Sequence, residues 1–151
     1  MGFLKNLINK ITGGGAKVSI EIDEAVLCEP FTVKVKAEVG DADLKIDKVY
    51  LYVKSTERAH FDNVEMRDHS GEIYTQDLEF DNGAFRQDFV VSGPDVLKAN
   101  QTYEWEIQIE LPEEAAPTFV GRNIQHVWEF YAGLDATGND PDSGWVIFDV
   151  Y

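Results

Sequence analysis

The sequence predicts a single all-β domain in which two antiparallel sheets enclose one hydrophobic core. Three observations support this prediction: segments whose apolar and polar residues alternate, turn-forming residues between those segments, and no helical periodicity after Lys17. At 151 residues, of which 44% are hydrophobic, the chain is long enough to bury a core of its own. Short strands without intervening helices are typical of a β-sandwich.

The clearest strand covers residues 103–111, where five apolar residues share one face and four polar residues share the other. A corner with Pro112 and Pro117 follows, because each proline removes a backbone donor and biases its neighbour toward extended geometry. Shorter alternating patterns predict the remaining strands, which are residues 18–22, 31–39, 48–54, 73–80, 85–92, 123–131 and 145–151.

Two segments in the middle of the chain are less regular. Residues 57–71 are polar and predict a long irregular loop or a ragged strand. Asp81-Asn82-Gly83 separates strands 73–80 and 85–92, and this combination is a strong hairpin-turn signal. We therefore expect a tight turn at 81–83.

The first residues predict a short amphipathic helix, which divides the chain into a helix at 1–12 and a sandwich at 16–151. The helix would carry its apolar residues on one face and its lysines on the other: Phe3, Leu4, Leu7, Ile8 and Ile11 against Lys5 and Lys10. Such a short helix needs something to dock on. Its own domain, a membrane or partner surface, or a second copy across a two-fold axis would each serve.

The net charge of −15 restricts the partners. The first 17 residues carry three lysines and no acid, so the remaining 134 carry −18. Such a body repels phosphate backbones, which excludes nucleic acid as an expected partner. Cys28 is the only cysteine, so no internal disulfide can form. With no apolar run of membrane-spanning length and no secretory signal pattern, we expect a cytoplasmic protein.

No motif predicts an enzyme, a cofactor or a firm metal site. The acidic loop offers four candidate calcium ligands, Asp135, Asn139, Asp140 and Asp142, but its spacing does not match an EF-hand, and these are also turn-forming residues. We expect a turn there. His60 and His69 fall in a polar segment, while His126 shares a strand face with Trp128 and predicts a core or boundary position.

Several residues resemble a known family. The stretch from Trp105 to Phe130 resembles the arrestin-like amino-terminal domain of the Spo0M-type sporulation-control family, through Leu111-Pro112, Pro117-Thr118-Phe119, Gly121 and residues 124–128. The strand opening Ala16-Lys17-Val18 and the acidic segment 139–142 also look similar. This resemblance implies an immunoglobulin-like, arrestin-like β-sandwich acting as a non-enzymatic adaptor. Cys28-Glu29-Pro30 departs from the family's Pro-Gly-Glu type turn, and the family commonly carries a second sandwich that these 151 residues do not hold.

Three functions stay open at this level. The first is a protein-interaction module that uses a sheet edge, either strand 31–39 guarded by Lys34 and Lys36 or strand 72–80. The second is a peripheral membrane regulator tethered by residues 1–11. The third is a carbohydrate-binding sandwich that uses Trp105, Trp128 and Trp145, although we expect these three to form a shared aromatic core.

Overall fold

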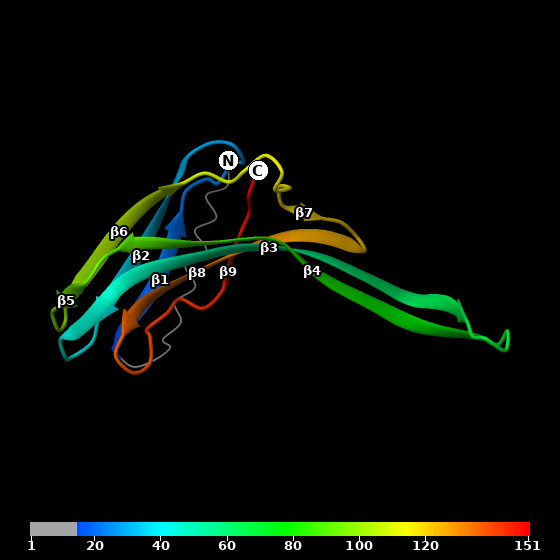
Figure 1. The fold of residues 1–151 in the computed structure, drawn as a ribbon, viewed down its shortest axis with the longest axis horizontal. Helices are drawn as coiled ribbons and strands as arrows, with labels where there is room; N and C mark the ends of the chain where they lie inside the picture. Colours follow the sequence, from blue (N-terminus) through cyan, green and yellow to red (C-terminus); the bar gives the residue numbers. More distant parts are fainter. Residues whose placement is uncertain (1–14) are drawn as a thin grey trace.

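The computed structural model describes residues 15–151, which form two antiparallel β-sheets and contain no helix (Figure 1). The smaller sheet has the order β1-β2-β6, from Ala16–Ile22, Phe31–Val39 and Thr102–Ile109. The larger sheet has the order β4-β3-β8-β7, from Ile73–Ser92, Leu44–Arg67, Ile124–Ala136 and Phe119–Val120. Two short strands complete it: β5 (Asp95–Leu97) pairs with β3, and β9 (Val146–Phe148) pairs with β8. The predicted helix at 1–12 lies outside the described residues.

The core lies between the two sheets. β2 buries every second residue, including Val33 and Val35, while Lys34 and Lys36 point away from the core. The larger sheet contributes residues such as Leu51 and Phe130, and the Phe130 ring meets the Phe31 ring of β2 edge-on at 6.5 Å. Each fully buried side chain of this size contributes about 1.5–3 kcal/mol. The predicted all-β architecture is confirmed for residues 15–151.

The proline corner before β7 is anchored by β8. The Trp128 indole Nε1 donates to the Ala116 carbonyl at 2.9 Å, and Nδ1 of the buried His126 contacts the Pro117 carbonyl at 3.0 Å. Because a carbonyl only accepts, the His126 proton sits on Nδ1. His126 therefore occupies the core position that its strand face predicted.

Strands β3 and β4 are much longer than their neighbours, with 24 and 20 residues. β8 pairs with β3 as far as Ala59↔Ile124, and beyond that pair β3 and β4 have only each other among the described strands. We call the hairpin from Thr56 to Gly83 the arm. Its part beyond the pair Ala59↔Phe80 projects from the sandwich as a two-stranded ribbon (Figure 1).

The turn expected at Asp81-Asn82-Gly83 is wrong. These residues lie inside β4 and pair with Arg58, Glu57 and Thr56, and the chain instead reverses at residues 68–72. Instead of a turn, this part of β4 contains a β-bulge. Ser55 pairs with Phe85 and Thr56 with Gly83, which leaves Ala84 as an extra residue in a strand that stays extended. Of the two alternatives for residues 57–71, the ragged strand holds as far as Arg67.

The edge role expected for Lys34 and Lys36 is also wrong. Their strand β2 is the centre of the smaller sheet and pairs with both β1 and β6. Lys34 instead forms a cross-strand ion pair with Glu106 of β6, at 3.7 Å. The second edge candidate, residues 72–80, belongs to β4, which does lie at an edge of the larger sheet.

Candidate interaction surface

Two β-bulges shape the arm. At Ala84 the extra residue keeps Phe85 and Phe80 on one face, although they are five positions apart and plain alternation would put them on opposite faces. At Asn63 the register shifts between Phe61 and Val64, so these two also share a face. Asn63 takes a left-handed φ of 51°, and its amide donates to the Asp77 carboxylate at 2.9 Å.

The bulges give the arm one apolar face. Register and alternation place seven apolar residues on the same side as the sandwich core, and we call this side the apolar face: Ala59, Phe61, Val64, Met66, Tyr74, Leu78 and Phe80. Phe80 is 57% exposed and Tyr74 is 44% exposed. The hydrophobic stripe of the core therefore continues along the arm and into solvent.

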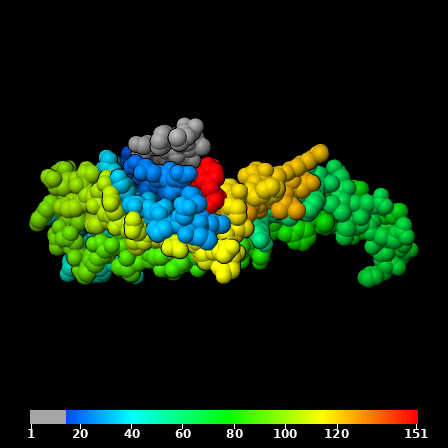
Figure 2. All heavy atoms as spheres, turned by 90° about the horizontal axis from the view of Figure 1, so that it is seen from above, coloured from blue at the N-terminus to red at the C-terminus, as the bar shows by residue number. Residues whose placement is uncertain are grey.

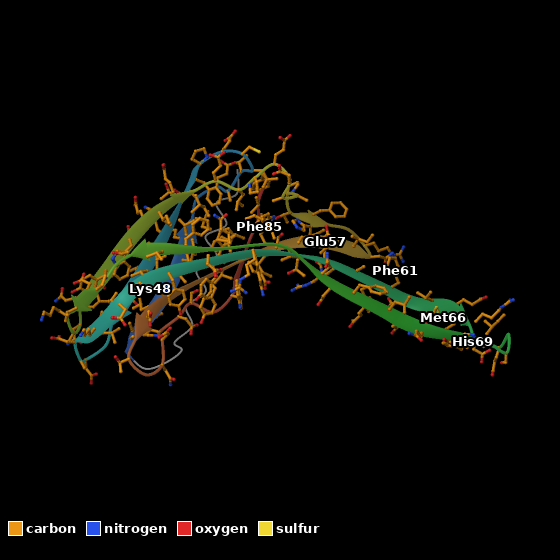
Figure 3. All side chains as sticks on the ribbon, in the orientation of Figure 1. Lys48, Glu57, Phe61, Met66, His69 and Phe85 are labelled. Carbon is orange, nitrogen blue, oxygen red and sulfur yellow. The ribbon has the colours of Figure 1, made fainter. Side chains whose placement is uncertain are left out.

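The smaller sheet does not extend over this face. Its strands cover the sandwich half of β3 and β4, where Leu51 and Val53 are fully buried. Figure 2 shows the arm extending well beyond the strands of the smaller sheet. Figure 3 shows Phe85 at the sandwich, Glu57 and Phe61 further out, and Met66 and His69 near the far end. A contiguous exposed apolar stripe is unusual on a protein surface and is typical of an interaction site.

The apolar face ends at the sandwich in a shallow hollow of about 530 Å³, which we call the root hollow. It is lined mainly by apolar side chains of the arm, the proline corner and strands β7 and β8, among them Ala59, Phe80, Pro117, Phe119 and Ile124. Phe119 and Ile124 are 57% and 54% exposed. The Glu57 carboxylate also borders the hollow and forms no ion pair with a described residue.

The opposite face of the arm is charged. His60 Nε2 lies 2.6 Å from Asp62, and its Nδ1 lies 3.0 Å from Glu79 on the facing strand. The hydrogen bond to Asp62, followed by the attraction of the Asp62 and Glu79 carboxylates, raises the pKa of His60. Arg58 adds a longer pair with Asp81 at 3.8 Å. The arm is thus an amphipathic ribbon.

The tip of the arm is a well-formed turn. The Asp68 carboxylate accepts hydrogen bonds from the Ser70 amide, the Ser70 hydroxyl and the Glu72 amide, at 2.7–2.9 Å. These bonds, with the Ser70 hydroxyl first, lower the pKa of Asp68. Gly71 takes φ +88°, a conformation that favours glycine. The pattern holds the last residues of the two strands together.

Two of the three tryptophans, Trp105 and Trp128, contribute to the core, whereas Trp145 does not. Trp128 is fully buried, Trp105 is half-buried beside Tyr103, and Trp145 is 38% exposed. Trp145 lies on the outer face of the larger sheet, packed against Tyr131 at 5.2 Å, with the Lys54 ammonium 3.9 Å from its ring centre. Trp145 directly precedes β9, whose first residue, Val146, faces the core, so alternation puts Trp145 on the opposite face.

Trp145 belongs to an outer aromatic cluster with Tyr50, Tyr52 and Tyr131, whose ring centres lie 4.8–6.3 Å apart. The Tyr50 hydroxyl donates to Asp140 at 3.1 Å. Burial is the main cause that raises the pKa of Tyr131, to about 12, and it also raises that of Tyr50. The rings pack on one another, and the Lys54 ammonium lies over one face of the Trp145 ring.

Two of the four candidate calcium ligands, Asp140 and Asp142, hold the loop in place through hydrogen bonds. Asp140 accepts from the Ala136 amide and the Tyr50 hydroxyl, and Asp142 accepts from the Gly144 amide. Asp135 belongs to β8, where it pairs with Lys48. Within residues 15–151, no group of three histidine, cysteine or acidic side chains is placed to hold a metal ion.

One pair missed at the sequence level resembles a nucleophile and its base. Nε2 of His126 lies 2.9 Å from the Ser55 hydroxyl. Ser55 is only 1% exposed and His126 only 5%, so a substrate has no access to the hydroxyl. Cys28, by contrast, is exposed, but partial burial and then the nearby Glu113 and Glu110 raise the pKa of its thiol. Neither group is arranged for catalysis.

The comparisons with known proteins place the fold in the arrestin-like class. The chain is similar in structure to Spo0M, the sporulation control protein from Bacillus subtilis, with a TM-score of 0.62 and 16% sequence identity. The match covers 91% of this chain and 50% of Spo0M, so the chain spans about half the length of that protein. No family model matches the sequence, and no curated protein matches it either. At this identity the likeness shows the fold.

Sequence reasoning did not find the apolar face of the arm. Its residues are visible in the sequence as Phe61, Val64 and Met66 on one strand and Tyr74, Leu78 and Phe80 on the other. Two bulges interrupt the alternation of apolar and polar residues between the arm and the core. The arm half and the sandwich half of each strand therefore looked like separate elements in the sequence. No helix in the described part of the chain is long and apolar enough to span a membrane.

Proposed function

We propose that this protein is a non-enzymatic, regulatory protein-interaction module and that the apolar face of its arm is the binding element. One observation carries the proposal: an amphipathic ribbon continues the core stripe into solvent, with Phe80 and Tyr74 exposed and no described strand covering them. An isolated two-stranded ribbon is marginally stable in water. A partner that buries the apolar face would stabilise it.

The type of fold agrees with this proposal. The chain shares the arrestin-like fold with a protein described as a sporulation control protein, which is a regulatory title. The arm offers apolar contacts for affinity, and the β4 edge offers backbone groups for strand addition. Both are features of a protein that binds another protein.

The proposal can be tested with a photo-crosslinking amino acid placed at single positions of the full chain in its native host. Leu78 lies on the apolar face, and Thr75 lies on the opposite face of the same strand. We expect protein adducts from position 78 and few from position 75. Equal yields from the two positions, or none from either, would refute a role for this face.

A further inference from the structure

We propose that the arm binds the arm of a second copy of this chain, so that the tip of each arm packs into the root hollow of the other. This inference rests on the proposed function and names the partner for the same surface. It commits to a two-fold symmetric dimer in which the two apolar faces meet.

The two ends of the apolar face differ in shape. At the root, Phe80, Phe119 and Ile124 surround a hollow of about 530 Å³. At the tip, Met66 and Tyr74 pair across the ribbon and stand on the same face, with Tyr74 44% exposed. A two-fold axis near the middle of the arm places the tip of one copy over the root of the other, and the same contact then occurs twice.

The two ends also differ in charge. The Glu57 carboxylate borders the root hollow and forms no ion pair with a described residue. Arg67, the last residue of β3, is exposed at the tip, and it too forms no such pair. Alternation places Arg67 on the charged face, next to Met66, and from the end of the ribbon its long side chain can reach around to the apolar face. A root-to-tip arrangement therefore joins Glu57 of each copy with Arg67 of the other.

The remaining charges permit the contact. The arm carries eight acids, and all but Glu57 lie on the charged face or in the turn at the tip. Two apolar faces can therefore meet without bringing any acid other than Glu57 into the interface. An acidic partner could not form an ion pair with Glu57, whereas a second copy brings Arg67 at the tip of its arm to the root hollow where Glu57 lies.

The size of the face sets the expected affinity. Eight residues of strand span roughly 25 Å, and a two-stranded ribbon is about 10 Å wide, so the two copies would bury on the order of 1,000 Å² in total. That area is at the lower end for specific complexes. We expect a reversible dimer whose population rises with concentration.

The test is sedimentation velocity on the full chain over a range of concentrations. The wild type should form a dimer, and Leu78→Asp should weaken it at least about tenfold, because a charge then enters the apolar contact. The matched control Thr75→Asp adds the same charge to the opposite face and should leave the dimer unchanged. A wild type that stays monomeric, or a Leu78→Asp variant that dimerises normally, overturns the inference.

A charge-exchange experiment tests the root-to-tip geometry itself. Glu57→Arg places like charges at both contacts of its homodimer, and so does Arg67→Glu, so each variant alone should dimerise less than the wild type. Mixed together, the two variants form a heterodimer in which both contacts join opposite charges, so the dimer should return. If neither variant weakens the dimer, or the mixture does not restore it, the proposed geometry is wrong.

Three further outcomes separate this inference from the proposed function. If removal of residues 1–12 abolishes the dimer while Leu78→Asp leaves it intact, dimerisation belongs to the first residues and the arm contact is refuted. If the chain is monomeric but position 78 crosslinks to a different protein in cells, the second copy is refuted and the interaction module stands. If the chain is monomeric and position 78 yields no adduct, both proposals fail.

Discussion

At the residue scale, the outer aromatic cluster depends on a glycine. Tyr50 packs across Gly133 of the neighbouring strand, to which it is directly paired, and its hydroxyl reaches Asp140. A Cβ atom built on Gly133 would overlap the Tyr50 phenol ring. The absence of a side chain at this position lets Tyr50 bury itself to 6% exposure on the outer face of the sheet.

We therefore predict that Gly133→Ala destabilises the protein by about 1–3 kcal/mol, because the Tyr50 ring or the backbone must shift. Chemical denaturation of the variant and the wild type measures the difference. Gly93→Ala is the control, since nothing lies within 4 Å of a Cβ at that position, and it should change the free energy of unfolding by much less. Equal effects of the two substitutions would contradict the packing explanation.

At the scale of the element, the arm is a ribbon whose two strands hold each other. Its apolar face offers half-buried cross-strand pairs such as Phe61 with Leu78, and its charged face offers His60 bridging Asp62 and Glu79. With no described sheet above it, the arm should open locally more easily than the sandwich.

The charged face makes arm stability dependent on pH. The pKa of His60 is raised in the folded arm, so the stabilisation is fully present below the unfolded value of about 6.5 and is lost as pH rises through the folded pKa.

We predict that hydrogen exchange of the arm amides, corrected for the intrinsic pH dependence of exchange, is better protected at pH 6 than at pH 8.5. His60→Gln should remove this difference, because glutamine keeps polarity without a titrating charge. His69 lies in the turn and forms no ion pair among the residues described, so His69→Gln serves as the control. A pH dependence that survives His60→Gln would contradict the assignment.

At the scale of the whole molecule, the net charge of −15 acts on stability and on association. Acids outnumber lysines and arginines by 28 to 13, so the folded state repels itself more than an extended chain does. Local pairs such as Lys34 with Glu106 and Lys54 with Glu129 offset only a part of this repulsion.

Raising sodium chloride from about 10 mM to about 0.5 M shortens the screening length from roughly 30 Å to about 4 Å. We predict that the melting temperature rises by several degrees over this range, because long-range repulsion is screened more than short pairs are. Chloride is preferred to sulfate, since sulfate also strengthens apolar burial. An unchanged or falling melting temperature would contradict a dominant role for the net charge.

Much of the sandwich was predictable from the sequence because alternation reports directly which face of a strand is buried. In β2 the pattern of Phe31, Val33 and Val35 matches the burial of those residues. The same rule failed on the arm because one extra residue at Ala84 and another at Asn63 reset the alternation. Asp81-Asn82-Gly83 has the composition of a turn, and only its pairing with β3 shows that the chain stays extended there.

Local periodicity and composition predict the fold class, the acidic net charge and which residues of the regular strands face the core, because these features need no long-range contacts. Only the three-dimensional arrangement shows which strand is central, which tryptophan is buried and where the smaller sheet stops. These features depend on contacts between residues far apart in the chain, such as Phe31 with Phe130 and Ala59 with Ile124. The arm is uncovered because the smaller sheet stops: β3 and β4 continue beyond it, and it covers only the sandwich half of each strand.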